Sequence, residues 1–111
     1  MELTQVTERQ FKTYIQSPMI RKDIWATKAK GVWLETILEY LQKEHGLELE
    51  AYYRGEDYSI GYYEHYYKSP KGIKVIFAHA RMGLPSLVIG INTKQEWIEL
   101  REILRKNGFV R

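Results

Sequence analysis

Cysteine is absent from this chain of 111 residues. Without a thiol the protein forms no disulfide, has no cysteine nucleophile and binds no metal through thiolates. These three kinds of chemistry are therefore excluded together. A chain without cysteine fits a reducing compartment, and we expect a cytoplasmic protein.

Long hydrophobic runs are also missing. Nowhere do eighteen apolar residues follow one another, and the N-terminus lacks the basic and apolar regions of a secretion signal. We therefore expect neither export nor a segment that spans a membrane. The length is enough for one hydrophobic core and too short for two, so we predict a single domain over residues 1–111.

Motifs of well-known chemistry are absent as well. The chain has no P-loop, no dinucleotide-binding GxGxxG, no HExxH and no GxSxG nucleophile turn. Its histidines, His45, His65 and His79, are not accompanied by carboxylates at the spacing of a dense metal motif. We expect no metal, no cofactor and a binding role in preference to catalysis.

Tyrosine is the residue that the chain has in excess. Seven of its nine tyrosines fall between Ala51 and Lys68, in the run AYYRGEDYSIGYYEHYYK. A rigid apolar ring with a hydrogen-bonding tip suits half-buried strands whose outer surface contacts a partner. The run therefore predicts a contact surface carried by strands.

Charge is unevenly distributed along the chain. Residues 1–34 sum to +3, residues 35–66 to −6 and residues 67–111 to +6, within a formal net charge of +3. The basic last segment suits contact with phosphates, whereas the acidic middle segment would repel them. A simpler explanation of the uneven distribution is that these charges pair with one another across the fold or are solvated.

Apolar spacing and end signals predict two helices in the first half of the chain. Thr7 and Gln10 form a capping box for the first helix, which ends before Pro18. Asp23 caps the second, in which helical spacing of apolar residues continues to Leu41. The second is expected to be the main core helix.

The ends of the second helix and of a third are marked by glycines and a capping box. Gly46 is placed to end the second helix in a left-handed conformation. Thr93 and Glu96 begin the third helix, and Gly108 and Phe109 close it with a Schellman motif.

Alternating apolar and polar residues predict four strands between the second and third helices. Their connections are too short for crossover helices, which indicates an antiparallel meander. Residues 2–6 are a candidate short edge strand. The predicted fold is α+β in the order α-α-β-β-β-β-α, with strands at residues 47–53, 58–67, 73–80 and 86–92.

Strand parity predicts which residues face the helices. On the first strand these are Leu47, Leu49, Ala51 and Tyr53. Tyr52, with Ile76 and Val88 from later strands, is expected on the outer face, which is too apolar to stay bare in water. We expect the first helix, a second copy of the chain or a ligand to cover this outer face.

The outer face and the turn at residues 68–74 predict a binding function. Bases of an unpaired nucleic acid stack on aromatic rings while lysine and arginine contact their phosphates. We expect the partner to be nucleic acid or a protein that handles it. The candidate contact residues are Arg54, Tyr63, Tyr67, Lys68, Lys71, Lys74 and Arg81.

Two alternative functions stay open. His79 and Arg81 share a strand face, and with a tyrosine across the hairpin they would supply the general acid and base of a small nuclease. Alternatively, the tyrosine-rich sheet joins two copies of the chain, which then acts as a homodimeric accessory protein.

Overall fold

The structure is a computed structural model that describes residues 3–26, 28–55, 61–79 and 83–110. Over these residues the chain forms an α+β fold of two helices, a six-stranded sheet and a two-stranded hairpin. Neither helix has the length and apolar character needed to cross a membrane within these ranges. The elements are β1 (Thr4–Gln5), β2 (Ile20–Trp25), β3 (Lys28–Ala29), β4 (Val32–Trp33), α1 (Leu34–His45), β5 (Glu48–Arg54), β6 (Tyr63–Lys68), β7 (Lys74–His79), β8 (Ser86–Ile91) and α2 (Lys94–Lys106).

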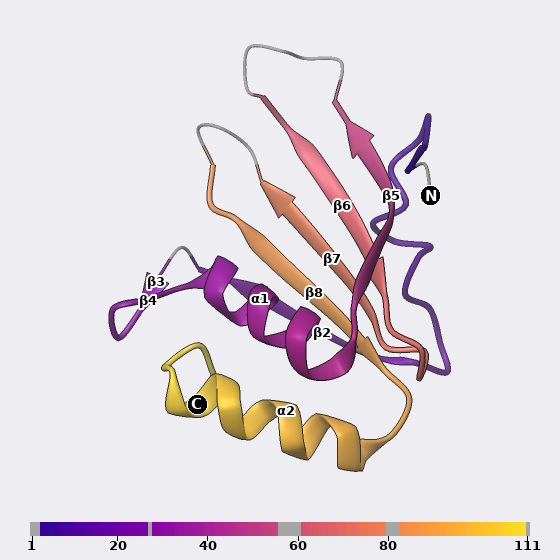
Figure 1. The fold of residues 1–111 in the computed structure, drawn as a ribbon. Coiled ribbons are helices and arrows are strands. Elements are labelled where there is room, and N and C mark those ends of the chain that lie inside the picture. Colours follow the sequence, from indigo (N-terminus) through magenta and orange to yellow (C-terminus); the bar gives the residue numbers. More distant parts are fainter. Residues whose placement is uncertain (1–2, 27, 56–60, 80–82, 111) are drawn as a thin grey trace.

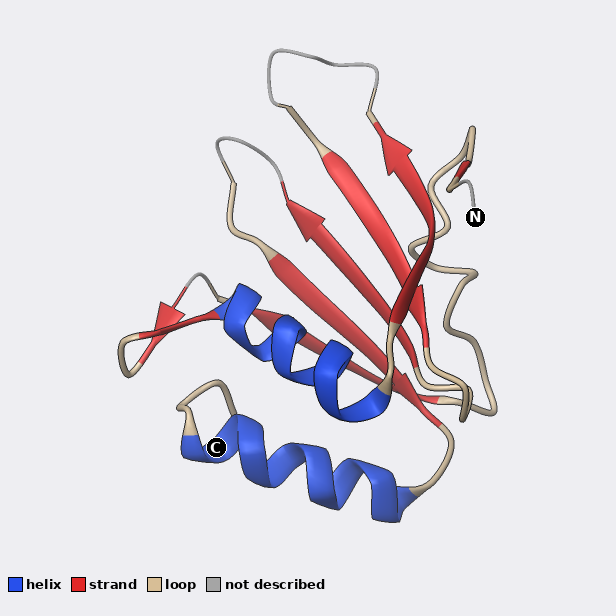
Figure 2. Cartoon of the chain, in the orientation of Figure 1, coloured by secondary structure: helices blue, strands red, loops and turns tan. Residues whose placement is uncertain are grey.

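The strands of the large sheet lie in the order β1-β5-β6-β7-β8-β2. All neighbours are antiparallel except β1, which runs parallel to β5 at one edge. Both helices lie on one side of this sheet, which we call the front face, across the lower part of the strands in Figure 1. Figure 2 shows that the upper ends of β5, β6 and β7 extend beyond both helices.

The predicted fold class is wrong in the N-terminal half of the chain. Residues 8–17, predicted to be helical, lie in a segment over residues 6–19 that forms turns and bends without a helix or strand. This N-terminal segment instead packs its apolar side chains on the other side of the sheet, the back face. A helix of about ten residues is marginal by itself, so these tertiary contacts decide the conformation.

Residues 20–25 are also strand where the sequence predicted the approach to a helix. All six residues of β2 pair with β8, from Ile20 opposite Ile91 to Trp25 opposite Ser86. Pairing with a central strand outweighs the capping signal of Asp23, since a cap stabilises by only about 1 kcal/mol. The helix begins later, at Leu34 of α1, and ends as predicted at Gly46 in the left-handed region.

The last helix and the four strands of the meander lie close to their predicted ranges. In the strand predicted over 58–67, residues 61–62 are not strand and β6 begins at Tyr63. Residues 58–60, and residue 80 of the next predicted strand, lie outside the described residues. β5 to β8 pair consecutively and antiparallel. The Thr93 hydroxyl accepts a hydrogen bond from the Glu96 backbone and donates to its carboxylate. At the other end, Gly108 and Phe109 donate to the carbonyls of Arg105 and Leu104 in a Schellman motif. These elements form from signals local in the sequence.

One residue of β5 reverses the predicted parity of that strand. Leu49 lies opposite Tyr67, yet Ala51 lies opposite Tyr66, so Glu50 is an extra residue in a β-bulge. After the bulge every side chain changes face. Ala51 and Tyr53 therefore pack on the back face, and the prediction that Tyr52 points outward is wrong.

The sheet separates two cores of unequal size. The front core joins the sheet to both helices and includes Leu38 and Leu104. The back core is a smaller cluster of Ile15, Tyr66, Ile76 and Val88 beneath the N-terminal segment. The back face is thus covered by the chain itself, although by an irregular segment and not by the helix that the sequence predicted.

Candidate functional site

Three rows of side chains cross the front face of β5, β6 and β7. Cross-strand register places Arg54, Tyr63 and His79 in the first row, nearest the upper end of the sheet. The second row is Tyr52, His65 and Phe77, and the third is Leu49, Tyr67 and Val75. Because opposing residues of an antiparallel pair share a face, all nine side chains point to the helix side.

Burial increases from the first row to the third. Arg54 is exposed, and Tyr52, Tyr63 and His65 are half-buried. Tyr67 is only 6% exposed and packs in the front core with Leu41 of α1. Tyr67 and Val75 of the third row and Phe77 of the second are therefore sealed, whereas Arg54, Tyr52, Tyr63, His65 and His79 stay at least partly open at the end of the sheet.

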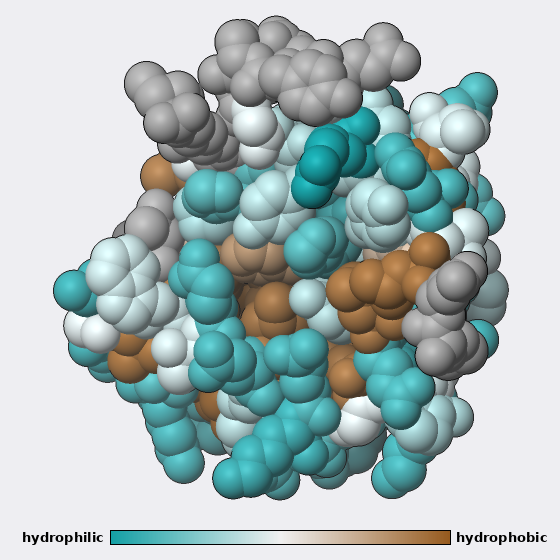
Figure 3. Space-filling view, turned by 45° about the horizontal axis from the view of Figure 1, so that its top comes forward, coloured by the Kyte–Doolittle hydropathy of each residue, from teal (hydrophilic) through white to brown (hydrophobic). Residues whose placement is uncertain are grey.

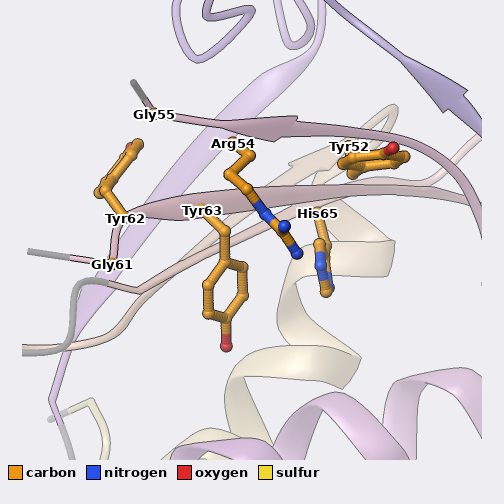
Figure 4. Close-up of a pocket in the computed structure, with 7 residues that line it drawn as sticks. All are labelled: Tyr52, Arg54, Gly55, Gly61, Tyr62, Tyr63 and His65. Atoms are coloured by element: carbon orange, nitrogen blue, oxygen red, sulfur yellow. The ribbon is translucent and has the colours of Figure 1, made fainter. Parts of the chain in front are cut away.

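A hollow of about 430 Å³ lies over these open rows, and we call it the front hollow. Its volume is within the range of small-molecule sites, which is about 300–1,000 Å³. Figure 4 shows Arg54, Tyr63 and His65 on the helix side of the two strands, with Tyr62 on the opposite side. The residues that line it are Tyr52, Arg54, Gly55, Gly61, Tyr62, Tyr63 and His65.

The rings of the front hollow contact one another. The ring centroids of Tyr63 and His65 are 4.7 Å apart, and those of Tyr63 and His79 are 5.8 Å apart. Phe77 supports Tyr63 from below at 6.3 Å. In Figure 3, which is turned by 45° from the view of Figure 1, apolar residues are visible near the centre among hydrophilic ones. Packed neighbours fix the rings before any ligand arrives.

The protonation states make this surface nearly neutral. Partial burial lowers the pKa of His65, and the positive charge of Arg54 lowers it further, so the imidazole is neutral near pH 7. Burial raises the pKa of Tyr63, and the carboxylate of Glu35 on α1 adds to the effect. Among the described residues that line the hollow, Arg54 carries the permanent charge.

The predicted contact residues separate into two groups. Arg54 and Tyr63 lie side by side in the first row, while Tyr67 is buried in the third. Lys68 and Lys74 pair at the other end of β6 and β7, five residues and about 17 Å from Tyr63. The structure does not bring the lysines to the aromatic surface, and Arg81 lies outside the described residues.

The lysines of the turn have other neighbours. The ammonium of Lys74 donates to the Tyr14 carbonyl at 3.2 Å and lies 4.8 Å from the centre of the Tyr14 ring. Lys74 is thereby part of the attachment of the N-terminal segment. Lys71 is exposed in the turn itself, where its carbonyl accepts a hydrogen bond from Asn92.

His65 and Tyr52 are members of the site that sequence reasoning missed. Tyr52 was assigned to the outer face, because the bulge at Glu50 leaves no mark in the alternation of residues. His65 was considered for a dense metal motif and set aside. Its spacing from Tyr63 could have identified His65 as a member of the site, since residues two apart on a strand share a face.

The acid and base set predicted for catalysis is only partly assembled. His79 contacts the ring of Tyr63 on the front face, as the cross-strand register requires. Its third member, Arg81, lies outside the described residues. Among the described residues, no three histidines, aspartates or glutamates are grouped so that they could hold a metal.

Comparisons with known proteins add no identification. No protein-family model, no curated protein and no solved structure matches this chain. The function is therefore argued from the front hollow and its surroundings.

Proposed function

We propose that this protein binds single-stranded nucleic acid by stacking unpaired bases on the two open rows of the front face. The observation that carries the proposal is the set of half-buried, neutral rings of Tyr52, Tyr63 and His65 beside one exposed arginine. Base stacking on aromatic side chains tolerates any sequence and contributes about 1–3 kcal/mol per base.

The charges around the front hollow favour bases over a continuous phosphate track. Arg54 supplies a bidentate donor for one phosphate. Glu35 is near enough to raise the pKa of Tyr63, and its negative charge opposes a second phosphate there. A nucleic-acid base is neutral, so Glu35 does not repel it and the neutral rings can stack on it. The ligand that fits is a short unpaired segment, and a duplex hides its base faces.

A titration with single-stranded and duplex oligonucleotides at several salt concentrations tests the proposal. We expect binding of the single strand and a shallow salt dependence, with a logarithmic slope of about −0.7 for one phosphate contact. Arg54→Gln should remove that slope. A slope several times steeper, or equal affinity for the duplex, contradicts stacking as the source of affinity.

Matched tyrosine variants locate the surface. Tyr63→Leu removes a ring from the front hollow and should weaken binding by at least about fivefold. Tyr53→Leu makes the same change on the neighbouring strand but on the back face, and should leave affinity unchanged. Lys71→Glu should also leave it unchanged, because this lysine lies in the turn at the other end of β7.

A further inference from the structure

A second hollow lies at the same end of the sheet on the back face, and we call it the back hollow. Its volume is about 280 Å³, and its lining includes Arg9, Phe11, Trp25, Tyr62, His79 and Leu84. Trp25 and Leu84 are 60% and 62% exposed. Single exposed apolar residues are common, but here two of them line one hollow together with the Phe11 ring.

The two hollows lie on opposite faces of the sheet at the same end of β6. Tyr62 lines both of them. His79 lines the back hollow, and its ring also contacts Tyr63 of the front hollow at 5.8 Å. A strand of nucleic acid that occupies both hollows would pass Tyr62, which lines each of them.

Arg9 gives the back hollow a cation held in a fixed position. Its Nε donates to the buried carboxylate of Glu64 at 2.6 Å, and its Nη2 donates to the Tyr62 hydroxyl at 2.8 Å. A guanidinium has five N–H donors, and this side chain is still 54% exposed, so others are open to a ligand. The guanidinium also lies 4.9 Å from the centre of the Tyr62 ring.

We propose that the back hollow is a second subsite for the same strand of nucleic acid, an inference that rests on the function proposed above. One base stacks against Trp25, which is 60% exposed, and the phosphate before it accepts hydrogen bonds from Arg9. Glu64 balances the charge of Arg9. The second subsite therefore adds affinity with little added salt dependence.

Oligouridylates of increasing length, from a dinucleotide to an octanucleotide, test this extension. We expect the affinity of the wild-type protein to rise with length until the strand spans both hollows. Trp25→Leu should leave dinucleotide binding unchanged and weaken octanucleotide binding by at least about fivefold. Trp33→Leu is the matched control, because Trp33 is a similarly exposed indole, 52% exposed, that lines neither hollow.

The outcomes separate the two proposals, with circular dichroism confirming that each variant is folded. If Trp25→Leu binds every length as the wild type does, or loses affinity equally for every length, the second subsite is wrong. In that case Tyr63→Leu still reports on the front hollow by itself. If no oligonucleotide binds the wild-type protein, both proposals are wrong.

Discussion

The two faces of the sheet are covered to different extents along β6. On the back face an irregular N-terminal segment closes over Tyr66, which is fully buried. On the front face the helices stop short, and Tyr63, three residues earlier on β6, stays half-buried over a hollow. Two tyrosines of one strand therefore have different roles, because burial by the rest of the chain and not residue type decides which ring can meet a ligand.

Truncation of these two tyrosines gives the largest contrast in stability. Tyr66→Ala removes a fully buried ring and should lower the free energy of unfolding by about 3–5 kcal/mol. Tyr63→Ala removes a half-buried ring and should cost about 1 kcal/mol. Urea unfolding followed by circular dichroism measures both. Equal losses would mean that the front rows are as closed as the back core.

The buried carboxylate of the back face should have the next largest effect. Glu64 is fully buried and accepts hydrogen bonds from Arg9, Tyr62 and Tyr66. Glu64→Ala should cost about 2–3 kcal/mol, because the buried Tyr66 hydroxyl loses its acceptor and Arg9 loses its partner. Glu50→Ala is the control, since Glu50 is exposed and accepts from Tyr14, and it should cost about 1 kcal/mol.

A substitution at Gly90 tests how closely the N-terminal segment packs on the sheet. A Cβ at Gly90 of β8 would lie 2.6 Å from Cγ2 of Ile15. Gly90→Ala should therefore destabilise the protein by about 1–3 kcal/mol through overpacking. In an Ile15→Ala background the same substitution should cost close to nothing. An equal loss of stability in both backgrounds would show that Ile15 is not the side chain with which the new Cβ clashes.

The pH dependence of stability should carry a small contribution from the front face. Burial and Arg54 lower the pKa of His65 below its unfolded value of about 6.5. As the pH falls below that value the unfolded chain takes up the proton first, so stability is lost on acidification. His65→Gln should lose less stability than the wild type between about pH 7 and pH 5. Parallel curves for the two proteins would contradict burial of the imidazole.

Local signals explain which parts of the fold were predictable. The cap at Thr93, the closing Gly108 and the turn within residues 68–74 are encoded by neighbouring residues, and they were predicted correctly. The course of residues 6–25 depends on contacts with strands more than forty residues away, such as Gln10 with Tyr66. No local pattern marks such contacts, so the helical signals of this region predicted helices that do not form.

The candidate site was predictable in composition but not in geometry. Arg54 and Tyr63 were predicted as contact residues, and the structure places them together in the first row. The single extra residue at Glu50 moved Tyr52 and Arg54 to the helix side, next to His65. A bulge is a property of paired strands, so alternation along one strand does not reveal it.

The most direct measurement of the central claim is a ring-by-ring NMR titration of the tyrosines with a single-stranded oligouridylate, using ¹³C-labelled tyrosine. The account predicts that the ring signals of Tyr52 and Tyr63 shift on binding, while those of Tyr14 and Tyr66, which pack on each other behind the sheet, stay in place. Shifts of Tyr14 and Tyr66 with Tyr63 unchanged would contradict it.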